Sequence, residues 1–141
     1  MFNWIPLNET ALEDYLASDQ IALFKQYQAN QNPLPNIIRD VCAYIRAFVP
    51  DDWQSGQTDK TFIPDTCKHI ACVLVIEALQ SRIPDLQLSE DQIRNADHAR
   101  QSLAQLKENW AQQADRRQGH HRIEAVRYRA HDASTKTLRG L

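Results

Sequence analysis

The stretch between Pro64 and Pro84 constrains this chain more than any other part of its sequence. From Ile70 to Leu79 it is apolar almost all round a helix, and such a helix has to be covered on every side. Its longest uncharged apolar run ends at Glu77, well short of the ~20 residues that a membrane span needs. The sequence therefore predicts a soluble protein with a buried central helix that ends near residue 82.

Three other segments have the apolar spacing needed to cover that helix. Helical signals run over residues 8–30, with a break in the middle, and a stripe with spacings of three and four predicts a helix over 35–49. A last amphipathic helix is expected to begin after Ser89, which forms a capping-box spacing with Gln92, and to end near residue 113. The predicted fold class is all-α: a compact bundle of about four helices, with a shorter split N-terminal helix and an extended basic C-terminal tail.

Six residues on these helices are expected to pack together as the core of the bundle. They are Val41, Ile45, Val73, Leu74, Ile76 and Leu103.

A polar loop over residues 50–63 separates two of the predicted helices. Loops of this length are often functional or mobile, and this one contains Trp53 and Lys60. A tryptophan in an exposed loop is a favoured anchor of protein interfaces. We therefore take Trp53 and Lys60 as candidate partner contacts, and expect Trp53 to be mobile or packed against another subunit.

Charge divides the chain into an acidic body and a basic tail. Residues 1–111 contain 9 Lys and Arg against 15 Asp and Glu, a net −6, whereas residues 112–141 contain 7 against 3, a net +4. Such asymmetry often marks an interaction arm. We predict one helical domain over 1–114 and a basic tail over 115–141.

The tail is expected to be extended. Apolar and basic residues alternate over 124–130, which favours a strand, and a lone strand needs a partner outside a helical body. The last residues are expected to lack regular structure. The candidate tail contacts are Arg116, Arg117, Arg122, Arg127, Tyr128 and Arg129. Docking on a protein, binding of nucleic acid and simple solvation all stay open for this tail.

No catalytic, cofactor or metal site emerges from the sequence. Three scattered glycines do not form a phosphate-binding loop. Cys67 and Cys72 are ~500° apart on a helix, so they are interpreted, with Cys42, as free thiols of the core rather than metal ligands. Most carboxylates lie at helix ends; Glu77 is the exception, and we expect it to pair with Arg39, Arg46 or another chain. The protein is predicted not to be an enzyme.

The order of these parts resembles a known family. A short helical pair leads through a proline-bounded turn into the helix 37–46, a variable loop follows, and residues 62–65 open the buried helix. That helix runs into the stretch 81–89, with its Arg-x-Pro stop and Ser89, before the final amphipathic helix. This pattern, over roughly residues 8–112, is similar to the small helical head–tail connector, or neck, proteins of tailed bacteriophages and prophages, above all the Mu-like group.

The resemblance implies a structural protein of the virion neck that is assembled in the cytoplasm of a bacterial host. It implies a ring of identical subunits, about twelve in the family, which sits beneath the portal protein and contacts a tail-side neck or tail-terminator protein. DNA would pass through the lumen, and no membrane would be involved.

Two readings from other classes stay open beside the connector. One is a small helical nucleic-acid-binding or regulatory module that acts through the basic tail. The other is an accessory subunit of an enzyme.

Overall fold

The computed structural model describes the backbone of residues 3–83 and 85–137, and the side chains of these residues up to Arg116, Asn30 excepted. The chain divides into two units, Met1–Lys107 and Glu108–Leu141. The boundary therefore lies about seven residues before the one expected from the sequence.

The first unit begins with a short strand, β1 (Trp4–Pro6), and two helices, α1 (Glu9–Glu13) and α2 (Ser18–Asn30). Helix α3 (Leu34–Arg46) follows the proline-bounded turn, and a 3₁₀ turn, η1 (Asp51–Gln54), opens the loop behind it. Strand β2 (Phe62–Pro64) and a second 3₁₀ turn, η2 (Asp65–Cys67), lead into α4 (Lys68–Arg82). Helix α5 begins at Glu90 and continues beyond this unit to Thr137. The all-α class and the split N-terminal helix are confirmed.

A two-stranded sheet that the sequence did not predict joins the N-terminus to the start of α4. β1 and β2 run antiparallel, with Ile5 opposite Ile63 and Trp4 opposite Pro64. Each strand has only three residues, so neither shows a readable alternation. The N–H of Asp65 donates to the carbonyl of Asn3 over 2.8 Å, which extends the contact by one residue.

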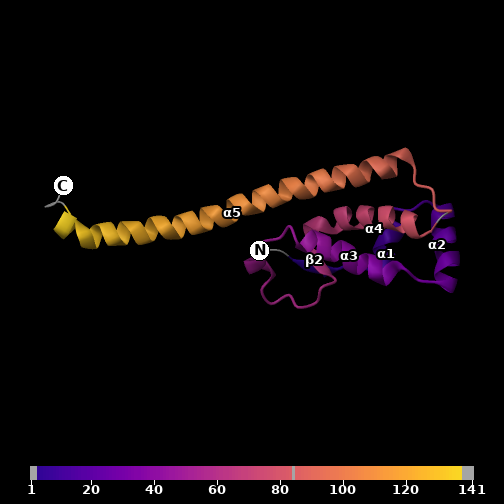
Figure 1. The fold of residues 1–141 in the computed structure, drawn as a ribbon, viewed down its shortest axis with the longest axis horizontal. Helices are drawn as coiled ribbons and strands as arrows, with labels where there is room; N and C mark the ends of the chain where they lie inside the picture. Colours follow the sequence, from indigo (N-terminus) through magenta and orange to yellow (C-terminus); the bar gives the residue numbers. More distant parts are fainter. Residues whose placement is uncertain (1–2, 84, 138–141) are drawn as a thin grey trace. The chain divides into compact units, whose positions relative to one another are not determined.

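Helices α3 and α4 lie side by side and form the centre of the first unit (Figure 1). Every residue of α4 from Ile70 to Ile76 is buried, as expected of a helix that is apolar all round. The six predicted core residues are all buried, and Ile45 and Leu103 have no exposed surface. The predicted core is therefore confirmed.

Hydrogen bonds between side-chain amides connect the start of α5 to the N-terminal helices. The predicted capping box is present: Gln92 N–H donates to Ser89 Oγ over 3.1 Å, and Ser89 N–H donates to Gln92 Oε1 over 2.9 Å. The amide of Gln92 is also paired with that of Gln20 on α2, at 2.8 Å, and Gln20 donates to the Gln87 carbonyl over 2.9 Å.

The second unit, Glu108–Leu141, differs from the expected extended tail. Helix α5 does not end near residue 113 but runs to Thr137, so the strand expected over 124–130 is a helix instead. Alanine, arginine and glutamate are good helix formers, and a helix satisfies its own backbone hydrogen bonds where a lone strand cannot. The short alternation over 124–130 was too weak a signal to outweigh these preferences.

Candidate functional site

The loop after α3 is organised around Arg46, the last residue of that helix. Its spacing of seven residues from Arg39 places the two on the same face of the helix, but the Arg46 side chain is only 5% exposed. Arg46 Nε donates to Gln54 Oε1 over 3.2 Å, Nη1 to the carbonyls of Asp59 (2.6 Å) and Phe62 (3.1 Å), and Nη2 to the carbonyl of Gln57 (2.8 Å). One buried guanidinium thus binds three backbone carbonyls between Gln57 and Phe62 and the side chain of Gln54.

Two further contacts complete this arrangement. Gln54 Nε2 donates to the carbonyls of Arg46 (2.8 Å) and Val49 (3.0 Å) at and just after the end of α3, and the Arg46 carbonyl also accepts from the Val49 N–H over 3.1 Å. The guanidinium carbon of Arg46 also lies 5.2 Å from the centre of the Trp4 ring, within cation–π range. Polar contacts to the end of α3 therefore hold the loop, and Arg46 itself also contacts Trp4 of β1.

The carboxylate of Asp59 supplies a negative charge beside this cluster, while the guanidinium bonds to the backbone carbonyl of the same residue. Its carboxylate accepts from the backbone N–H of Thr61 over 2.9 Å and from the Thr61 hydroxyl over 2.7 Å. These two bonds lower the pKa of Asp59, and the positive charge of Arg46 contributes in the same direction.

An open groove of about 420 Å³ lies along this face. Its charged lining residues are Arg39, Arg46, Asp51 and Lys60. Lys60, one of the predicted contacts, is exposed there, whereas Trp53 is half-buried and belongs neither to the core nor to the fully exposed surface. The role of both residues as partner contacts stays a prediction.

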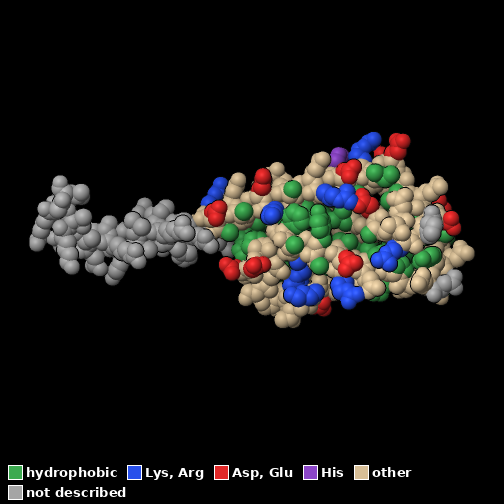
Figure 2. All heavy atoms as spheres, viewed as in Figure 1, with side chains coloured by type: hydrophobic (Ala, Val, Ile, Leu, Met, Phe, Trp, Pro, Cys, Tyr) green, Lys and Arg blue, Asp and Glu red, His purple; other side chains and the backbone are tan. Residues whose placement is uncertain are grey.

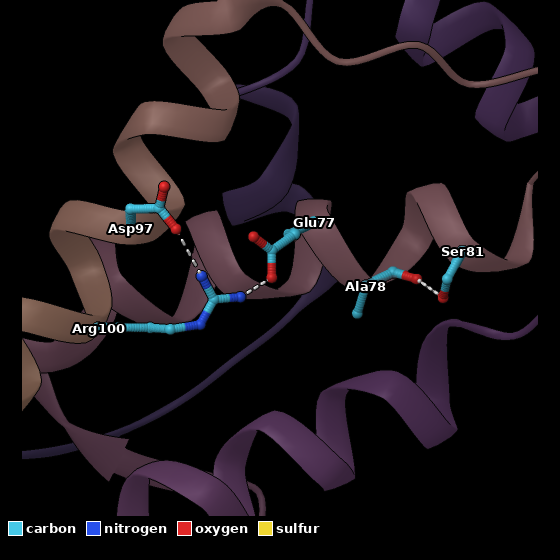
Figure 3. Close-up of polar contacts among 5 residues, drawn as sticks. All are labelled: Glu77, Ala78, Ser81, Asp97 and Arg100. Atoms are coloured by element: carbon cyan, nitrogen blue, oxygen red, sulfur yellow. Dashed lines mark hydrogen bonds and ion pairs between the residues drawn. The ribbon is translucent and has the colours of Figure 1, made fainter.

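A second groove, of about 270 Å³, lies on another side of α3 and also involves α4 and α5. It is lined by Asp40, Val41, Tyr44, Leu74, Glu77 and Arg100. Figure 3 shows Glu77 and Arg100 pointing toward each other, with Asp97 on the other branch of the guanidinium at 3.1 Å. Glu77 therefore pairs with Arg100, and the expected partners Arg39 and Arg46 were wrong.

Tyr44 stands at this second groove with 44% of its surface exposed. Its ring meets that of Phe48 edge-on, with the ring centres 5.2 Å apart. Lys107 Nζ lies 5.5 Å from the centre of the same Phe48 ring.

On the face drawn in Figure 2, acidic and basic side chains are interspersed with exposed apolar ones, so charge of a single sign does not dominate it.

The three cysteines are free and buried, as expected of core thiols. Burial raises the pKa of the Cys42, Cys67 and Cys72 thiols to about 11, so they are poor nucleophiles near neutral pH. Within the described ranges, 3–83 and 85–137, no group of three or more His, Cys, Asp or Glu is placed to hold a metal ion.

The predicted tail contacts lie on α5. Arg116 is exposed, and the side chains of Arg117, Arg122, Arg127, Tyr128 and Arg129 lie outside the described residues. Of the helices that the structure describes, none combines the length and apolar character needed to cross a bilayer.

Comparisons with protein-family models, with curated proteins and with solved structures find no match to this chain.

Proposed function

We propose that this chain is a head–tail connector of a tailed bacteriophage or prophage, which forms a ring beneath the portal protein and joins the head to the tail. Its partners in this proposal are other copies of itself, the portal and a tail-side neck or terminator protein. DNA passes through the lumen of the ring, and the protein performs assembly rather than catalysis.

The observation that carries the proposal is the order and spacing of the elements in the first unit. The first unit has the order of elements on which the resemblance to the connector family is based. This order is a proline-bounded turn, α3, a loop, the buried α4 and the Ser89-capped α5. Both grooves flank α3, so the first unit presents two surfaces of different chemistry. A ring needs such unlike surfaces, since each subunit contacts one neighbour with one face and the next neighbour with another.

Deletion of the gene from the phage or prophage that encodes it tests this function directly. We expect filled heads and separate tails in electron micrographs, with infectious particles restored when the intact chain is supplied from a plasmid. As a matched control, the plasmid should carry the chain with an early stop codon. Normal tailed particles from the deletion strain would refute the connector role.

A nucleic-acid-binding module is the second candidate, and the helical course of the basic segment favours it. α5 continues through residues 116–129, which contain five arginines, and a basic helix can follow the phosphates of a duplex. In a gel-shift assay at several salt concentrations, a module of this kind binds duplex DNA with an affinity that falls steeply as salt rises. Replacement of Arg127 and Arg129 by Gln then reduces the salt dependence. For a connector that does not contact DNA, the affinity is negligible above about 0.1 M salt.

A further inference from the structure

Asp40 and Tyr44 lie one helical turn apart on α3 and share a groove. Both side chains are exposed, Tyr44 by 44% of its surface. Among the residues that the structure describes, the Asp40 carboxylate has no hydrogen-bond or ion-pair partner. An exposed carboxylate beside an exposed aromatic ring is a pair of groups that suits a guanidinium, which stacks on the ring and bonds to the carboxylate.

The groove below them fits the rest of an arginine side chain. Its floor includes the apolar side chains of Val41 and Leu74, on which a methylene stem can lie. At the far rim, Glu77 is already occupied by Arg100, so the unpaired negative charge of the groove is that of Asp40. The groove can therefore contact a bound side chain through one aromatic ring, one carboxylate and an apolar floor.

The arginines of the first unit near this groove already have partners. Arg39 donates to Asn36, Arg46 is buried against the loop oxygens, and Arg100 holds Glu77 and Asp97. The segment 116–129 contains five arginines within a tail of net charge +4, attached to a body of net charge −6. Charge complementarity thus favours this segment as the source of the arginine.

We propose that the groove at Asp40 and Tyr44 binds an arginine from the basic segment 116–129 of a second copy of this chain. The proposal rests on the self-assembly assumed in the proposed function, and it adds the contact that links one subunit to the next. A groove on the body and a segment of the tail are two unlike surfaces of one chain, as a head-to-tail contact requires.

Photo-cross-linking in the full-length chain tests which segment occupies the groove. A benzophenone amino acid replaces Tyr44 in one sample and Gln26, an exposed residue of α2, in a control sample. Each protein is prepared in light and heavy isotopic forms, which are mixed in equal amounts before irradiation and digestion. At position 44 we expect cross-links to peptides from 116–129, about half of them joining a light chain to a heavy one. Cross-links within one copy, or to any other segment, would overturn the proposal.

A charge exchange tests the same contact without a probe. Asp40→Arg is expected to weaken self-association at least about tenfold in analytical ultracentrifugation at low salt, as is the double change Arg127→Glu with Arg129→Glu. Combining all three changes in one chain should restore most of the association. Asp52→Arg, an exposed carboxylate outside this groove, serves as the control and should leave association unchanged.

The remaining outcomes separate this contact from the connector function. A wild-type chain that stays monomeric at low salt would overturn the contact, because an ionic contact is strongest there. Suppression of the position-44 cross-link by added duplex DNA would assign the arginines to phosphates instead. If gene deletion gives tailless heads but Asp40→Arg supports normal particles, the connector function stands and the groove contact falls.

Discussion

Two arginines hold two sides of the first unit, and they do so in opposite ways. Arg46 is 5% exposed and its hydrogen bonds go to neutral oxygens of the loop after α3. The Arg100 side chain is 40% exposed and is paired with two carboxylates, Glu77 and Asp97. By a count of ion pairs, Arg100 would be the more important residue for stability.

The expected contributions to the free energy of unfolding give the opposite order, with Arg46 ahead of Arg100. A hydrogen bond from a charged group contributes about 1.5–3 kcal/mol when it is shielded from water, and an acceptor left buried without a donor carries a further cost. Exposed ion pairs contribute about 0–1 kcal/mol, because water screens them and two long side chains lose freedom. The loop therefore depends on its arginine, while the Glu77 groove depends on the apolar residues beneath the ion pair.

The apolar floor of the groove should produce the largest effect. Leu74 lines the groove from α4 and is 6% exposed, so Leu74→Ala is expected to lower the free energy of unfolding by about 2–5 kcal/mol. Urea denaturation followed by circular dichroism measures this change. Gln80→Ala, at an exposed position of the same helix, is the control and should stay within about 0.5 kcal/mol of the wild type. A Leu74→Ala cost below 1 kcal/mol would show that the floor is not tightly packed.

Loss of Arg46 should come next and should act on the loop. Arg46→Met removes the donor to the carbonyls of Gln57, Asp59 and Phe62, and we expect a cost of about 2–4 kcal/mol. The loop can open to water and so relieve part of this cost, which makes the loss largely local. Hydrogen exchange should therefore rise over residues 50–64 and change little in α4.

Two companion variants sharpen the Arg46 result. Arg46→Lys keeps the charge but not the planar fork of donors, so it should recover only part of the loss. Arg39→Met, at an exposed site on the same helix, should leave both unfolding and exchange near the wild-type values. Equal effects at positions 39 and 46 would contradict the role assigned to the buried guanidinium.

Alkaline pH should weaken the fold by a smaller, graded amount. Cys42 lies one turn before Arg46, and its thiol donates a hydrogen bond to the Thr61 carbonyl over 3.5 Å. Burial raises the pKa of this thiol from 9.0 to about 11, and the positive charge of Arg46 opposes the rise. Below pH 9 the thiol is protonated in both folded and unfolded chains, so its contribution is complete. Between pH 9 and 11 the unfolded chain releases the proton first, and stability falls by at most about 1.4 kcal/mol per pH unit for this group.

Comparison with Cys42→Ala isolates this thiol from other groups that titrate at high pH. The difference in unfolding free energy between the two proteins, measured in reducing buffer from pH 8 to 10.5, should shrink as pH rises. A difference that stays constant with pH would mean that the thiol ionises equally in both states. In Arg46→Met the decline should extend to higher pH, because the opposing positive charge is gone.

Particular residues show what could be predicted from the sequence. The burial of α4 and the Ser89–Gln92 box follow from local spacing, and both are confirmed. The role of Arg46 could not be predicted in this way, because helical periodicity places Arg46 on the same face as Arg39. Only the loop that folds back over α3 buries Arg46 and leaves Arg39 exposed. The sequence indicates that Glu77 needs a partner, but it does not identify Arg100 as that partner. The two residues are 23 positions apart, and no local sequence pattern links them.

Breaking the ion pair at the groove should have the smallest effect of the series. The Arg100 and Glu77 side chains are 40% and 31% exposed, so Arg100→Gln should cost at most about 1 kcal/mol in unfolding free energy, and less in 1 M salt. Glu77→Gln should behave alike, and the double variant should cost little more than either single one. Such a double-mutant cycle gives the pairing energy itself. A coupling above about 2 kcal/mol would place Arg100 in the same class as Arg46, and the contrast between the two arginines would then have to be abandoned.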